Sequence, residues 1–122
     1  MAKRQADLDA GVERMLALGH REDDGVGFEV LLGVVRPVWE ADAGTLQLYE
    51  TARGIAASLG FDLPHGSEGG GSDGNFTGAL GIPTLDGLGP RGTGFHTLNE
   101  HIEVDSLADR ARLMAGLLLA LK

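Results

Sequence analysis

The chain contains no cysteine, and only 5% of its 122 residues are aromatic. The absence of cysteine excludes disulfide bridges and thiolate metal sites, and it is compatible with a reducing compartment. No apolar run reaches the roughly 18 to 20 residues that span a bilayer, and the N-terminal stretch lacks the apolar core of a signal peptide. We therefore expect a soluble, cytoplasmic protein with no membrane partner.

Basic residues are also scarce. Ten Lys and Arg stand against 18 Asp and Glu, which gives a formal net charge of -8. Because binding to nucleic acid requires clustered Lys and Arg, and the only local cluster is Lys3-Arg4, we expect no nucleic-acid partner. The length suits one domain of ordinary size with a small core.

Glycine, by contrast, is abundant, with 20 residues that concentrate between Gly60 and Gly94. This middle region must consist largely of turns and loops. Since loops on a rigid scaffold often carry functional groups, we expect the chemistry here.

Apolar periodicity predicts several elements around this region. The expected helices cover residues 5–18, 42–59, 75–80 and 106–121. The expected strands cover residues 26–40 and, as a short buried strand, 82–90. Residues 20–25 are expected to form a polar turn and residues 91–104 a loop.

Polar residues mark the expected helix starts. Asp42 is the N-cap candidate of the second helix, and Ser72 or Asp73 caps the brief one. Asp105 or Ser106 caps the last helix, where Ser106 with Asp109 forms an approximate capping box. The apolar stripe expected to be buried on this last helix is Leu107, Ala111, Met114, Leu117, Leu118 and Leu121.

The glycine-rich stretch "EGGGSDGN" contains a literal Gly-x-Gly-x-x-Gly at Gly69, Gly71 and Gly74. A dinucleotide site needs a strand before these glycines and a full helix after them, and a Walker loop needs Lys-Ser or Lys-Thr. The sequence favours neither. Two readings remain open: a plain turn that lets one backbone approach another, and an anion site formed where small polar residues begin a helix.

The four histidines do not form a metal motif. They are His20, His65, His96 and His101, and the sequence contains neither His-x-x-x-His nor His-Glu-x-x-His. A zinc site needs three or four converging ligands. His96, Glu100 and His101 are close in sequence, but no complete metal site can be identified from the residues alone.

The stretch "GGGSDGNFTGALGIPTLDGLGPRGTGFHTLNEHIEVDSLADRARLMAGLL" closely resembles the C-terminal end of the zinc-dependent aminoacylase and carboxypeptidase family. That family includes glutamate carboxypeptidases, which look nearest, acetylornithine deacetylases and succinyl-diaminopimelate desuccinylases. The resemblance is strong from Pro64 to Leu121 and weaker through residues 42–59 and the "VVRPVWE" segment.

The resemblance implies an α/β fold in which residues 1–40 are the tail of a small α+β lid (dimerisation) domain. Residues 41–122 would then be the C-terminal part of a zinc-peptidase-like α/β catalytic domain. It implies that His96 is a ligand of one of two zinc ions, and that Arg36 binds a substrate carboxylate. An ordinary strand-end arginine is an equal alternative for Arg36. The implied substrate-side loop consists of Gly69, Gly70, Gly71, Ser72, Asp73 and Asn75.

The sequence departs from the family where the other ligands should be. It has no His-x-Asp motif, bridging Asp or Glu-Glu pair with a general base. We therefore expect a C-terminal fragment of an amidohydrolase that cleaves N-acyl amino acids or peptides, inactive alone and without an assigned catalytic residue. The partner would be a missing N-terminal half or a second copy. The alternative is a noncatalytic self-associating module, with the "FEVLLGVV" stretch as the pairing surface.

Overall fold

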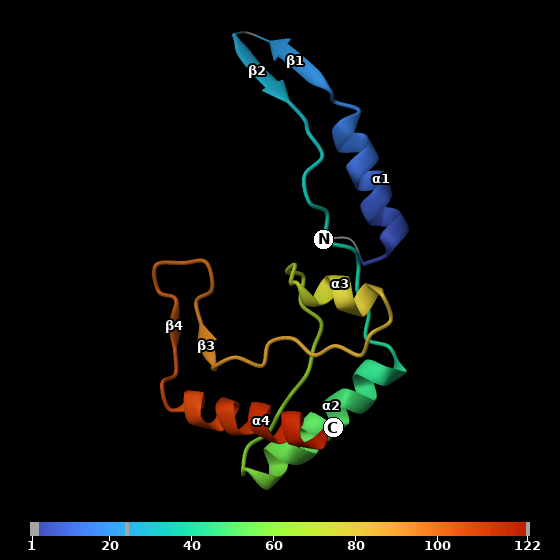
Figure 1. The fold of residues 1–122 in the computed structure, drawn as a ribbon. Helices are drawn as coiled ribbons and strands as arrows, with labels where there is room; N and C mark the ends of the chain where they lie inside the picture. The colour runs from blue at the N-terminus through green and yellow to red at the C-terminus, as the bar shows by residue number, and fades with distance from the viewer. Residues whose placement is uncertain (1–2, 24, 122) are drawn as a thin grey trace. The chain divides into compact units, whose positions relative to one another are not determined.

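The computed structural model describes residues 3–23 and 25–121, which belong to two units. Unit 1 comprises Met1–Glu40 and Glu68–Ile82, and unit 2 comprises Ala41–Ser67 and Pro83–Lys122. Each unit combines helices with a two-stranded antiparallel sheet, which in unit 2 has strands of only two residues (Figure 1). This small mixed helix and strand architecture is compatible with the expected α/β class. The assignment of the units to a lid and a catalytic domain stays a prediction.

Unit 1 begins with α1, Gln5–Leu16, which ends two residues before the predicted end. Gly19 follows with φ of 59°, a left-handed conformation that glycine adopts without strain, and its N–H donates to the Leu16 carbonyl at 3.0 Å. The C-cap of α1 is Ala17, so Gly19 lies just beyond the end of the helix.

A β-hairpin comes next, and it corrects two predictions. β1, His20–Asp23, pairs antiparallel with β2, Val26–Glu29, so His20 lies opposite Glu29. Residues 20–23, expected as a turn, form a strand instead. The strand expected over 26–40 ends at Glu29. Among the described residues, 31–35 form neither helix nor strand and have no ladder partner, because a high strand propensity cannot supply a neighbouring strand.

Unit 1 closes with α3, Gly74–Ala79, as predicted. Its Gly78 lies directly against the indole of Trp39, so close that a Cβ at this position would overlap the ring. A glycine inside a six-residue helix is unfavourable for helix propensity. The close approach of Trp39 explains why the helix has one here.

Unit 2 is built on two longer helices, α2 over Ala43–Ser58 and α4 over Ser106–Ala120. Between them β3, Gly92–Thr93, pairs antiparallel with β4, His101–Ile102, within a stretch expected to be only loop. Across residues 3–23 and 25–121, no helix has the length and apolar character needed to cross a membrane.

The core of unit 2 lies where α2 packs on α4. Ala52 and Ala56 of α2 and Leu113 of α4 are completely buried, and Leu117 is 4% exposed. Small residues on one helix leave room for leucines on the other. Gly116 allows the same close approach, because a Cβ there would lie 2.7 Å from Ile55 Cγ2.

Two predictions for α4 are wrong. The buried side of α4 is Ser106, Leu113 and Leu117, whereas most of the predicted stripe is exposed, with Leu118 at 70%. The helix has apolar residues on more than one side, and α2 covers only one of them. Ser106 makes no capping bond within α4, as its hydroxyl bonds elsewhere.

Residues 82–90 form no strand in the described chain; instead Leu85 and Leu88 of this stretch pack against the α2–α4 core. Side-chain burial here is thus supplied by helix packing and not by a ladder. The stretch is also held by the Thr84 N–H, which donates to Thr45 Oγ1 at 3.3 Å.

The predicted Asp42 cap is confirmed, and it makes the stability of the folded chain depend on pH. The Thr45 N–H donates to the Asp42 carboxylate at 2.7 Å, which lowers the pKa of Asp42 from its ordinary value of 3.8. A lowered folded-state pKa gives stability that is present above the ordinary pKa and lost as the pH falls through the lowered value.

We expect Asp42→Ala to lower the thermal unfolding midpoint at neutral pH, with the difference from the native chain shrinking as the pH falls below about 4. Calorimetry across pH 2 to 7 measures this. Asp42→Asn is the matched control, since it keeps an acceptor but cannot ionise. A deficit of Asp42→Ala that persists unchanged at the lowest pH would contradict the assignment.

Candidate functional site

The glycine-rich loop of unit 1 is closed by its own side chains. The Ser72 N–H donates to Asn75 Oδ1 and the Gly74 N–H donates to Ser72 Oγ, both at 2.9 Å. Asp73, the other predicted cap, occupies the N-cap position but makes no capping bond. The first turn of α3 is thus satisfied by Ser72 and Asn75, which is local side-chain capping and requires no bound anion.

The loop is also fixed to residues 36–37, which follow β2 in the sequence. Asn75 Nδ2 donates to the Pro37 carbonyl at 2.8 Å, across 38 residues of sequence. Next to this contact, Arg36 Nη2 lies 3.3 Å from Asp73 Oδ1. A Cβ on Gly71 would lie 3.1 Å from Arg36 Cδ, so the glycine lets the loop backbone approach the arginine.

The structure therefore brings together five of the predicted substrate-side residues: Arg36, Gly71, Ser72, Asp73 and Asn75. Gly69 and Gly70 only flank the cluster. Both are exposed, and a Cβ added to Gly70 would meet nothing within 4 Å. Within the described residues no strand lies between α2 and these glycines, so they lack the structural context of a dinucleotide fingerprint.

His96 lies in unit 2, in the turn between β3 and β4, with its side chain exposed. Its φ of 64° is uncommon for a residue other than glycine. The conformation is held by the backbone, since the His96 N–H donates to Glu100 Oε2 at 3.1 Å and the Thr97 N–H donates to the Gly94 carbonyl at 3.0 Å. Such strained positions are concentrated at functional sites.

The hairpin that carries His96 is anchored to α4 through Ser106, which is completely buried. Its hydroxyl donates to the Glu103 carbonyl at 2.6 Å and accepts from the Arg91 N–H at 2.8 Å. The Arg91 guanidinium also binds the Glu103 carboxylate at 2.9 Å, which raises the pKa of Arg91. The sequence suggested Ser106 only as a helix cap and gave no sign of this link.

The residues present do not fit a metal centre by themselves. Across residues 3–23 and 25–121, no three His, Cys, Asp or Glu side chains are grouped closely enough to hold a metal ion. His101 Nδ1 lies 2.8 Å from the Asn99 carbonyl oxygen, and the His65 ring packs on Tyr49 with centroids 4.4 Å apart. A catalytic zinc needs three protein ligands, and His96 offers one.

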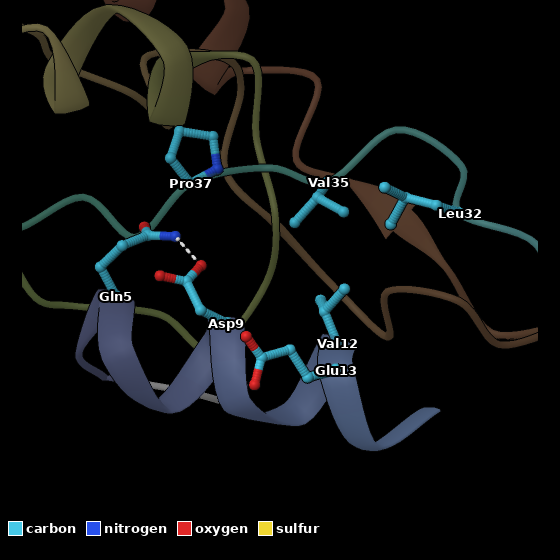
Figure 2. A pocket seen from close by; sticks show the side chains of 7 residues that line it. All are labelled: Gln5, Asp9, Val12, Glu13, Leu32, Val35 and Pro37. Carbon is cyan, nitrogen blue, oxygen red and sulfur yellow. Dashed lines mark hydrogen bonds between the residues drawn. The ribbon is translucent and has the colours of Figure 1, made fainter. Parts of the chain in front are cut away.

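Unit 1 also contains a shallow groove that the sequence did not predict. It lies between α1 and residues 32–37, and its volume is about 370 Å³. Figure 2 shows Asp9, Val12 and Glu13 on the helix, facing Leu32 and Val35 across the groove. The groove thus leaves apolar side chains of the segment accessible beside two carboxylates.

The sequence pattern of peptidase family M20/M25/M40 matches residues 8–120. The chain belongs to this family. The matched range includes Arg36, the glycine-rich loop and His96. Members of this family are metal-dependent peptidases, which are hydrolases. No curated protein and no solved structure gives a significant match.

The position of Ser106 in this M20/M25/M40 chain predicts a large effect of a small change. Ser106→Ala removes a completely buried hydroxyl that makes two hydrogen bonds, and at roughly 0.5–1.5 kcal/mol per bond we expect the change to cost about 1–3 kcal/mol. Urea unfolding measures the loss. Ser58→Ala is the control, because its exposed hydroxyl bonds only the Ile55 carbonyl, and it should cost no more than about 0.5 kcal/mol. Equal losses in the two variants would disprove the anchoring role.

Proposed function

We propose that this M20/M25/M40 chain is the C-terminal part of a di-zinc amidohydrolase of the glutamate carboxypeptidase type. The intact enzyme would hydrolyse the amide bond of an N-acyl amino acid or a peptide. The observation that carries the proposal is His96, a solitary histidine held on a strained, exposed turn inside the matched range. A turn of this kind leaves the imidazole accessible to a metal ion whose other ligands come from elsewhere.

The residues around Arg36 suit the binding of the substrate. A guanidinium is the preferred partner of a carboxylate, and Arg36 is half exposed beside a loop that is fixed by Asn75. In this proposal Arg36 binds a substrate carboxylate, and residues 69–75 line the substrate-binding site. His96 contributes one imidazole to a zinc ion.

The exposed surface supports the view that other chains or segments cover this one. The chain exposes 9221 Å². Two separate compact bodies, each with half of its mass, would expose about 7,500 Å² in total by the usual scaling of area with mass. Among the described residues of unit 1, none is buried. Such a unit cannot be stable through its own core, and it gains stability where a neighbour covers it.

We expect the purified 122-residue chain to bind zinc weakly, well below two ions per chain, and to show no turnover of an N-acylglutamate substrate, since one imidazole is too few ligands. Metal analysis after dialysis and a hydrolysis assay with added zinc test this. His96→Ala should then behave like the native chain in both assays. Two tightly bound zinc ions with robust turnover would overturn the proposed inactivity of the isolated chain.

A second candidate is a noncatalytic module that pairs with its own copy, and the unpaired segment 31–35 favours it. This segment contains no charge, lacks a ladder partner within the described chain, and has Leu31 and Val34 at 76% and 84% exposure. An apolar segment of high strand propensity whose backbone groups are free can pair with a second strand. In this reading, as in the first, a cytoplasmic location without nucleic-acid or membrane partners remains part of the proposal.

Self-pairing through this segment predicts a dimer whose population rises with protein concentration. Val34→Lys should shift the mass measured by analytical ultracentrifugation to that of the monomer, because paired copies would bring two lysines close together. Leu80→Lys is the control, as Leu80 is similarly exposed at 78% in the same unit but lies outside the segment. A native chain that stays monomeric at high concentration would count against the module.

A further inference from the structure

The Arg36–Asp73 pair has a property that the proposed function does not use. Among the described contacts, Arg36 makes one hydrogen bond, the 3.3 Å bond from Nη2 to Asp73 Oδ1. A guanidinium has five N–H donors, so most of its capacity is free for a ligand. Asp73 is 92% exposed and the arginine is 46% exposed. A contact of this length and exposure contributes little to stability, and a ligand displaces it at small cost.

The loop does not need this pair to keep its shape. Ser72 and Asn75 close the first turn of α3, and Asn75 binds the Pro37 carbonyl, all without the Asp73 side chain. The carboxylate of Asp73 is therefore free to move away from Arg36 while the loop backbone stays in place. It is an anion that occupies the place where the proposed function puts the carboxylate of the substrate.

We propose that Asp73 is a specificity-determining residue, which competes for Arg36 and restricts it to ligands that pair one carboxylate with a neighbouring N–H donor. The inference rests on the proposed function of Arg36. An N-acyl amino acid brings such a carboxylate and amide N–H together, so it can satisfy both members of the pair. A compact, multiply charged anion such as sulfate has no O–H or N–H donor for Asp73 and is repelled by it.

The test compares N-acetylglycine with sulfate on the 122-residue chain, by titration of the Arg36 Nε–H resonance in NMR spectra at fixed ionic strength. Asp73→Asn should tighten sulfate binding roughly fivefold, the factor that corresponds to about 1 kcal/mol for unit charges 4 Å apart in water. Binding of N-acetylglycine should change less, so the preference for it falls. Asp86→Asn removes the same charge from an exposed aspartate of the other unit and should leave both affinities unchanged.

The possible outcomes separate the two proposals. If N-acetylglycine binds at Arg36 but Asp73→Asn leaves the preference over sulfate unaltered, the role of Asp73 is overturned and the carboxylate site stands. If neither ligand moves the Arg36 resonance in the native chain or in Asp73→Asn, the carboxylate site itself is wrong, and the role of Asp73 is wrong with it. Arg36→Gln should abolish the binding of both ligands, and retained binding would place them elsewhere.

Discussion

The contact between α2 and α4 is the interaction on which the rest of unit 2 depends. Ala52 and Ala56 are small enough for the backbones to come close, and Leu113 and Leu117 fill the space between them. Gly116 against Ile55 continues the same arrangement. Because few side chains are fully buried, each contributes a large share of a small core. The β3–β4 hairpin has only two-residue strands, so its position depends on α4 as its support.

Hydrogen bonds of Ser106 connect α4 to the hairpin that carries the candidate metal ligand, His96. Ser106 is buried at the start of α4 and bonds both Arg91 and Glu103, the residues that flank the hairpin. The turn at its tip then holds His96 in a left-handed conformation through Glu100. In unit 1 the equivalent fixed point is the bond from Asn75 to Pro37, which places Arg36 beside the loop. Both candidate site residues are thus positioned by hydrogen bonds from neighbouring loops and not by a surrounding core.

Local signals in the sequence predicted well, and signals that depend on a distant partner did not. Asp42 marks the start of α2 through its contact with Thr45, three residues away, so its role follows from spacing. The expected strand over 26–40 failed because extended propensity says nothing of whether a neighbouring strand exists. The stripe on α4 failed for a related reason: Leu118 is as apolar as Leu117, and only the position of α2 decides which of them is buried. Resemblance identified Arg36, the glycine-rich loop and His96, but the approach of Asp73 to Arg36 spans 37 residues and has no sequence signature.

The exposed apolar surface and the solitary histidine are explained by one cause if the chain is part of a larger assembly. A peptidase of the M20/M25/M40 family needs several metal ligands, and no three His, Cys, Asp or Glu side chains of the described residues are grouped to hold a metal ion. The segments that supply the missing ligands must also lie against this chain, where they would cover apolar side chains such as Leu118 and Val34. Self-pairing of segment 31–35 accounts for the exposure of Val34 but gives no reason for a strained, outward-facing histidine in the other unit. The incomplete-enzyme reading is therefore favoured, because it accounts for both features with the same missing residues.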